Sequence, residues 1–209
     1  MKKFSGSLAE TDPEFMGKGK FAPSPDLYPP IPGTLFQAFK ENAEKVNAGV
    51  TFAETEEELV SAVDGLITGN GWENVVCLED NISVLLRKAG SRISFSEKLS
   101  EWTEVAITGC ESLIAHLGSV IVSSGQSGSR RIFIYPPVHL VVATTSQLSE
   151  SLEEGYAKTI MKYRDQLPSF ISIITGPSRT ADIEKTLVLG AHGPVQLHIF
   201  VLNDNFEPK

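Results

Sequence analysis

An arginine among small polar residues is the first feature of this chain that could do chemistry. The candidate ligand-binding residues are Gly176, Ser178, Arg179 and Thr180. The apolar run 170–174 predicts a buried strand and the run 180–187 predicts a helix, so backbone N–H groups at the helix start would point at a ligand. The guanidinium of Arg179 suits a carboxylate or a phosphate. The pattern predicts a site for a small anionic ligand; a well-capped helix with Arg179 on the surface explains the same residues.

A second glycine-bracketed turn follows this loop. It places His192 between Gly190 and Gly193-Pro194. Because imidazole exchanges a proton near neutral pH, His192 is a candidate catalytic acid or base, and Gly193 a candidate ligand-binding residue. A turn histidine bonded to nearby backbone is the alternative.

A third candidate segment runs from Thr108 to His116. The sequence predicts a strand over 105–108 and a short helix over 109–117 that Gly118 ends. Thr108 and Gly109 would then bind a ligand at the strand end. Glu111 is a candidate catalytic carboxylate, as in transferases that form acyl-Glu intermediates, or else a first-turn residue that complements the helix dipole.

Composition restricts the classes of protein that fit. The 209 residues carry a formal net charge of −8, which argues against nucleic acid or an anionic membrane as the main partner. Cys77 and Cys110 are neither in a CxxC pair nor near a histidine at metal-ligand spacing. We therefore expect reduced thiols, no metal, no iron–sulfur cluster and no cofactor in this chain. Neither a signal peptide nor an apolar run of membrane length is visible, which favours a cytoplasmic protein.

Strands and helices alternate along most of the chain. Residues 1–33 are rich in Gly and Pro and predict an extended arm, on its own domain or on a neighbouring subunit of a homo-oligomer, or a disordered tail. Residues 34–209 predict a single α/β domain with a mostly parallel twisted sheet, helices on both faces and an inserted antiparallel hairpin. The further elements expected are helices at 35–46, 55–67, 81–88 and 149–167, and strands at 50–52, 74–77, 119–123, 131–135, 138–143 and 195–202, with the hairpin between 119 and 143.

The run from Thr175 to Glu184, with Gly190 to Pro194 behind it, closely resembles the signature of the LUD domain family, in the branch of lactate utilisation protein C. The segments 108–119 and 136–142 resemble two further family blocks. The resemblance covers roughly residues 35–202. It implies a fold similar to ribose-5-phosphate isomerase, glucosamine-6-phosphate deaminase and CoA transferases.

The resemblance also implies a role in L-lactate oxidation to pyruvate, beside an iron–sulfur partner and a cysteine-rich-domain partner. The first hypothesis is thus a non-redox subunit that binds a small anion or its partners. A stand-alone isomerase-like or transferase-like enzyme on a phosphorylated or CoA-linked acid is the second. Where the family usually has Glu-Thr, this chain has His116-Leu117, which motivates a third: a regulatory or scaffold domain with a vestigial site.

Overall fold

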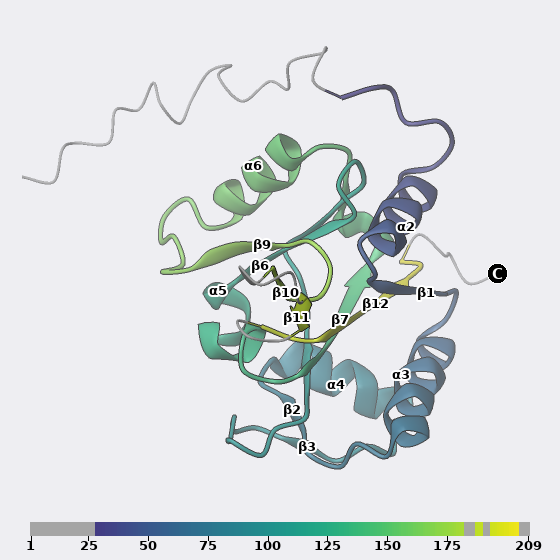
Figure 1. Ribbon diagram of the computed structural model, residues 1–209, viewed down its shortest axis with the longest axis vertical. Helices are drawn as coiled ribbons and strands as arrows, with labels where there is room; N and C mark the ends of the chain where they lie inside the picture. The colour runs from purple at the N-terminus through teal and green to yellow at the C-terminus, as the bar shows by residue number, and fades with distance from the viewer. Residues whose placement is uncertain (1–27, 182–186, 190–192, 205–209) are drawn as a thin grey trace, which may run out of the picture.

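The computed structural model describes residues 28–181, 187–189 and 193–204. Its centre is a six-stranded sheet in which every neighbouring pair is parallel (Figure 1). In spatial order the strands are β1 (Gly49–Ala53), β12 (Gln196–Leu202), β7 (Val138–Thr144), β4 (Val105–Thr108), β2 (Val75–Cys77) and β3 (Phe95–Ser96). Because all six strands run the same way, their carboxyl ends share one edge of the sheet.

Helices α3 (Glu56–Asn70) and α4 (Asp80–Lys88) cover one face of this sheet. The Thr55 hydroxyl caps α3 by accepting from the Glu58 N–H, and Gly71 ends the helix in the left-handed region with φ 69°. Leu59, Val63 and Ile67 recur at helical spacing, and all three are fully buried against the sheet. The apolar period of the sequence thus decides which side of α3 faces inward.

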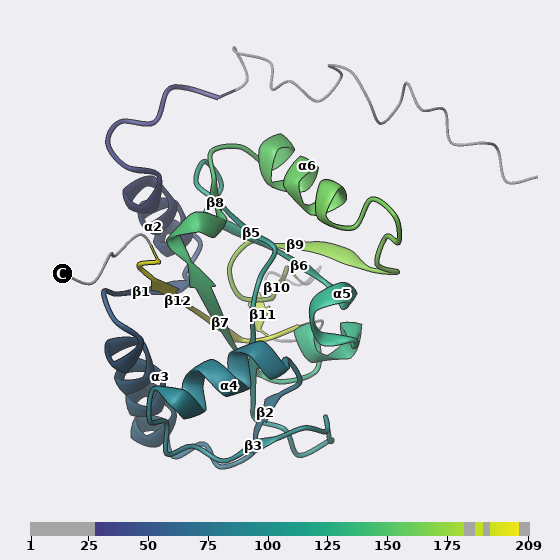
Figure 2. The same cartoon turned by 180° about the vertical axis from the view of Figure 1, so that it is seen from behind.

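The other face carries helix α2 (Leu35–Lys45) and a second, mixed sheet. The strands of this sheet, in spatial order, are β8 (Leu148–Ser149), β5 (Ser112–Ile114), β6 (Ser119–Ser123) and β9 (Ile171–Ile174). Helix α6 (Leu152–Lys162) lies on its outer side, so α6 and the pair α3–α4 are at opposite ends of the molecule (Figure 2). At Gly155, the contact between α6 and β5 is so close that an added Cβ would lie 2.3 Å from Ile114 Cδ1.

The α/β class, the parallel sheet and the presence of an antiparallel hairpin are confirmed, but the hairpin has other residues than expected. Strands β5 and β6 pair antiparallel over 112–121 within the second sheet. Residues 109–117, predicted to be helical, therefore form the loop, first strand and turn of this hairpin. Gly118, with φ 61°, makes its tight turn, and an added Cβ there would collide with the Ala43 backbone.

Three other predicted elements differ in the structure. The predicted strand at 131–135 is the 3₁₀ turn η1 (Arg130–Phe133), which follows the short helix α5 (Ser124–Ser127). Helix α6 is shorter than the predicted 149–167 because 3₁₀ turn η2 (Thr145–Gln147) and β8 precede it, and Tyr163 caps its end. The predicted helix over 180–187 is wrong at both ends. There, β10 (Arg179–Ala181) and β11 (Leu187–Leu189) pair antiparallel, with 182–186 outside the described residues.

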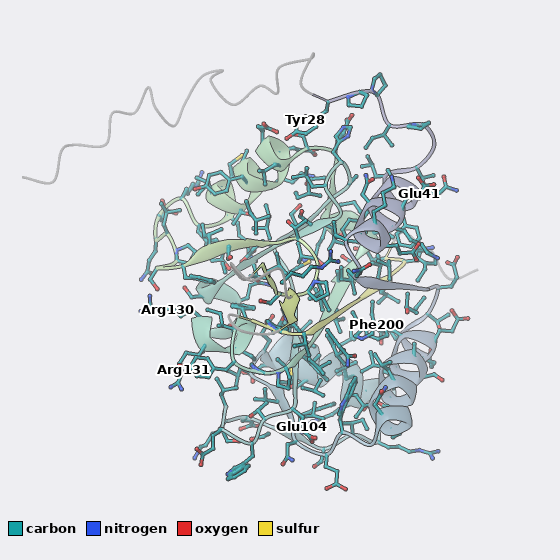
Figure 3. All side chains as sticks on the ribbon, in the orientation of Figure 1. Tyr28, Glu41, Glu104, Arg130, Arg131 and Phe200 are labelled. Carbon is teal, nitrogen blue, oxygen red and sulfur yellow. The ribbon has the colours of Figure 1, made fainter. Side chains whose placement is uncertain are left out.

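The last residues of the predicted N-terminal arm lie against the domain. Tyr28, which is labelled in Figure 3, stacks on His116 at the hairpin turn, and Ile31 packs against the core. The ring centroids of Tyr28 and His116 are 4.6 Å apart. Burial and the neighbouring carboxylate of Glu153 raise the pKa of Tyr28. The rest of the predicted arm, residues 1–27, is outside the described residues. Within the described ranges, no helix has the length and apolar character that crossing a bilayer requires.

Candidate functional site

A cavity of about 560 Å³ opens at the carboxyl edge of the parallel sheet. Its volume lies in the range typical of sites for small molecules and cofactors. One wall is apolar and comes from α4 and the ends of β7 and β12: Ile82, Leu85, Val142 and Leu202. The polar part of the lining, called the polar wall here, includes Glu79, Gln126, Lys162 and Tyr163. The cavity can therefore hold a ligand that has both apolar and hydrogen-bonding groups.

Glu79 is the buried acid of this cavity, two residues after β2 ends. It is 4% exposed, and its Oε1 accepts a 3.0 Å hydrogen bond from the Gly109 N–H. Burial raises the pKa of Glu79 to about 7; the Glu111 carboxylate raises it further, whereas the Gly109 hydrogen bond and Lys162 oppose the rise. A carboxyl with this pKa can donate or accept a proton near neutral pH.

Gly109 packs against the carboxyl group of Glu79. An added Cβ at residue 109 would lie 2.8 Å from Glu79 Oε2 and 3.4 Å from Gln126 Nε2. An added Cβ would therefore force Glu79 Oε2 to shift, and the same residue supplies the N–H that holds Glu79. The prediction of Gly109 as a ligand-binding residue thus falls at the cavity, although its clearest role in the geometry is to hold Glu79.

Glu111 lies directly behind the polar wall rather than on it. Its side chain is 1% exposed, and its two oxygens accept three hydrogen bonds. The donors are Ser123 Oγ at 2.5 Å, Tyr163 OH at 2.8 Å and Lys162 Nζ at 2.8 Å. Three donors, one of them cationic, stabilise an ionised carboxylate. Glu111 thereby fixes Tyr163 and Lys162 in the cavity wall, which is the geometry of a positioning residue.

Glu111 raises the pKa of two groups that contact it, Lys162 and Tyr163. Burial lowers the pKa of Lys162, but the hydrogen bond and charge of Glu111 outweigh this effect and leave the pKa above its ordinary value. The pKa of Tyr163 is raised, first by burial and also by the charge of Glu111. Lys162 therefore remains a cation and Tyr163 a neutral donor at neutral pH.

Thr108 contacts a buried histidine instead of the cavity. Its Oγ1 lies 2.8 Å from Nε2 of His139, which is completely buried in β7. Burial alone lowers the pKa of His139 to about 4, so its ring is neutral at pH 7. Because the Thr108 hydroxyl also donates to the Gly109 carbonyl, the consistent arrangement has His139 Nε2–H donating to Thr108. Thr108 and His139 thus anchor the strand end that carries Gly109.

The loop over residues 176–179, which carries Arg179, lies away from this cavity. Gly176, with φ 72°, packs on the Val46 carbonyl, and Arg179 Nη2 donates to the same oxygen at 2.9 Å. The Ser178 N–H donates to the carbonyl of Pro194, and an added Cβ at Gly193 would lie 3.3 Å from Ser178 Cβ. Val46 precedes β1 and Pro194 precedes β12, so the loop is at the amino edge of the sheet.

The arrangement that the sequence predicted is therefore not present among the described residues. The helix that would have presented N–H groups to an anion is strand β10 over residues 179–181. Arg179 and Glu111 belong to opposite edges of the sheet and do not face one site. The side chain of Thr180 and the whole of His192 lie outside what the structure describes.

The site residues predicted from the sequence do not include four residues of the polar wall: Glu79, Gln126, Lys162 and Tyr163. For Glu79 the sequence does carry a signal, because two acids, Glu79 and Asp80, follow the predicted strand 74–77. In the structure Glu79 is the residue before the helix and Asp80 is its first residue. The other three come from α5 and from the end of α6, far from any motif.

Neither thiol nor any metal cluster forms a second centre in the described ranges. Cys77 and Cys110 are buried and free. Burial raises the pKa of Cys77 to about 11 and that of Cys110 further still, so both are neutral thiols. Within the same ranges, no three His, Cys, Asp or Glu side chains are grouped so that they could hold a metal ion.

Fold and cavity together define an α/β protein with a ligand-sized pocket at the carboxyl ends of a parallel sheet. The sequence pattern of the LUD domain matches residues 36–202, and the chain belongs to the LUD domain family. A structure of a DUF162 family protein from Deinococcus radiodurans superimposes with a TM-score of 0.61 at 21% identity, over 82% of this chain and 99% of that one. A ribose-5-phosphate isomerase structure aligns at a TM-score of 0.31 and 13% identity.

Several sequence relatives carry one name. The chain is 25% identical to "Lactate utilization protein C" of Halalkalibacterium halodurans, over 81% of this chain and 80% of the relative. It is 26% identical to the protein of that name from Anoxybacillus flavithermus, over 82% and 86%. The Bacillus subtilis protein is 32% identical over 51% of this chain and 45% of its own length. The expected resemblance is confirmed at the level of the family and of these homologues.

Proposed function

We propose that this protein is the non-redox component of a system that oxidises L-lactate to pyruvate. The observation that carries the proposal is the match to relatives named Lactate utilization protein C over about four fifths of the chain. The partners we propose are an iron–sulfur protein and a protein with cysteine-rich domains, in the cytoplasm. The two buried neutral thiols of this chain leave electron transfer to those partners.

Within that role, we propose that the ligand occupies the cavity at the carboxyl edge. Glu79 supplies a titratable carboxyl, and Gln126 and Lys162 supply donors. Gly109 and Glu111 contribute by holding these groups, and Thr108 by anchoring Gly109. We propose that Arg179, which donates to the Val46 carbonyl, holds the junction between α2 and β9 instead of a ligand.

Deletion of the gene tests the proposed role. The deletion strain should fail to grow on L-lactate as sole carbon source and grow normally on glucose, and a plasmid-borne copy should restore growth. Unimpaired growth of the deletion strain on L-lactate would contradict the proposal.

The buried carboxyl also favours a second candidate, a stand-alone enzyme that moves a proton on a small acid. A purified chain that turns over such an acid without any partner would favour this candidate over the first. Loss of lactate growth together with a purified chain that only binds its ligand would favour the non-redox component.

A further inference from the structure

Three polar atoms at the Gly109 end of the cavity keep hydrogen-bonding capacity for a ligand. Glu79 Oε2 and Gln126 Nε2 have no hydrogen-bond partner in the described part of the chain, since Glu79 Oε1 and Gln126 Oε1 make the contacts to the protein. Lys162 Nζ uses one of its N–H bonds on Glu111 and keeps two.

Two other polar groups of the cavity lining, Gln147 and Tyr163, are already hydrogen-bonded within the protein. Gln147 accepts from the Thr144 N–H and donates to the Cys110 carbonyl, and the Tyr163 hydroxyl donates to Glu111. A ligand therefore meets two fixed donors, one amide and one ammonium, and one group, Glu79 Oε2, that is a donor or an acceptor according to its proton. Gly109 keeps Glu79 Oε2 and Gln126 Nε2 close together, because both atoms lie within 3.4 Å of the place its Cβ would take.

The charges around Glu79 leave its protonation adjustable. The Glu111 carboxylate on the hairpin and the Lys162 ammonium on α6 act on it in opposite directions. Tyr163 on the same helix and the thiols of Cys77 and Cys110 are neutral, and Asp80 at the start of α4 is exposed. Within the described ranges, no cation forms an ion pair with Glu79, and Lys162 is paired with Glu111.

We propose that this end of the cavity binds a 2-hydroxy acid and the corresponding 2-oxo acid, and that Glu79 adjusts its proton to whichever is bound. A ligand hydroxyl donates to ionised Glu79 and accepts from Gln126. A ligand carbonyl cannot donate, so it requires Glu79 to be protonated and to donate. Lys162 is the cation available to the carboxylate of either acid.

This inference rests on the proposed role in lactate oxidation, from which the two acids are taken. It goes beyond that role by assigning to Glu79 the proton that differs between the complexes with the two acids. Exchange of L-lactate for pyruvate at the site requires Glu79 Oε2 to gain one proton, and the reverse exchange requires it to lose one. No bond of the ligand is made or broken in this binding step.

Isothermal titration calorimetry of the purified full chain with sodium pyruvate and sodium L-lactate tests the inference. Each titration is run in phosphate and in Tris at pH 7.5, since the difference in observed heat between buffers reports protons exchanged. We expect pyruvate binding to take up a proton and L-lactate binding to take up none. From pH 6 to pH 8, pyruvate should bind roughly tenfold more weakly, as expected for a required proton on a group with a pKa of about 7.

Glu79→Gln carries a permanent donor, so it should bind pyruvate without proton uptake, independently of pH, and bind L-lactate more weakly. Asp80→Asn removes the adjacent exposed charge and should retain the wild-type proton uptake. Proton uptake that persists in Glu79→Gln, or a wild-type chain that binds neither acid at millimolar concentration, would overturn the inference. Because the wild-type pH series needs no variant, the test survives a Glu79→Gln chain that does not fold. Lactate growth that depends on the gene, with no proton uptake on pyruvate binding, would refute this inference and leave the proposed role standing.

Discussion

At the scale of single residues, burial raises the pKa of Glu79 to about 7, so that its carboxyl can gain or lose a proton near neutral pH. The carboxyl is removed from water, and one backbone N–H is its only hydrogen bond in the described part of the chain. The side chain of Glu111 is also buried, yet three donors satisfy it. Two carboxylates close to one another thus have different tasks, because their surroundings differ in donors.

The pKa of Glu79 makes a prediction about stability. The folded chain, with a pKa of about 7, keeps a proton that the unfolded chain loses near pH 4.5. The stability from this group is therefore complete below pH 4.5 and is lost as pH rises through 7. Relative to wild type, Glu79→Gln should gain of the order of 1–3 kcal/mol in free energy of unfolding between pH 5 and pH 8.

Urea unfolding of both chains across this pH range measures the difference. Taking the difference also removes the opposite effect of His139, whose pKa near 4 costs stability as pH falls below about 6.5. Parallel pH curves for the two chains would show that Glu79 is not the titrating group.

Gly109 gives a second prediction at this scale. Gly109→Ala places a Cβ 2.8 Å from Glu79 Oε2, so we expect a loss of about 1–3 kcal/mol of stability. Gly65→Ala, in the middle of α3, meets nothing within 4 Å and should gain about 0.5–1 kcal/mol from helix propensity. Thermal unfolding of both variants provides the comparison; equal effects of the two substitutions would argue against the packing described for Gly109.

The sequence predicts part of the cavity lining, but not Glu79. It places Thr108 and Gly109 at a strand end, and both lie there, with Gly109 in the lining of the cavity. Glu79 was not found because nothing local distinguishes it from Asp80. Which of the two acids turns inward depends on the packing of α4 against β2.

At the scale of elements, the hairpin shows where apolar periodicity fails. Residues 113–115 and 120–122 are buried throughout, since their sheet lies between the parallel sheet and α6. A strand buried on both faces lacks the alternation that separates a strand from a helix. The prediction of a helix over 109–117 failed for this reason, and with it the view of Glu111 as a first-turn residue.

Helix α6 positions the polar wall, and Gly155 sets its distance from β5. Gly155→Ala would bring a Cβ within 2.3 Å of Ile114 Cδ1 and 2.9 Å of Ser112 Oγ, so either α6 or these β5 side chains must shift. We expect a loss of about 1–3 kcal/mol and a weaker contact of Tyr163 with Glu111. Gly69→Ala, near the exposed end of α3, is the matched control. Thermal unfolding and the near-ultraviolet spectrum of the tyrosines report the two effects; a Gly155→Ala chain as stable as the control would contradict the close contact.

At the scale of the whole molecule, the parallel sheet separates the two groups of candidate residues. Alternating strands and helices correctly predicted the α/β class, because each strand is bounded by clear turns and caps. The order of strands places Gly109 and Glu79 at one edge and the Arg179 loop at the other. That separation depends on long-range pairing, such as that of β12 between β1 and β7, which local sequence does not encode.

Complementation of the deletion strain on L-lactate is the most direct test of the central claim, that the working site is the cavity around Glu79. We predict that a gene encoding Glu79→Gln fails to restore growth, although the protein accumulates to wild-type level. Arg179→Ala loses one hydrogen bond to a backbone carbonyl and should restore growth. Growth at the wild-type rate with Glu79→Gln, and none with Arg179→Ala, would contradict the account.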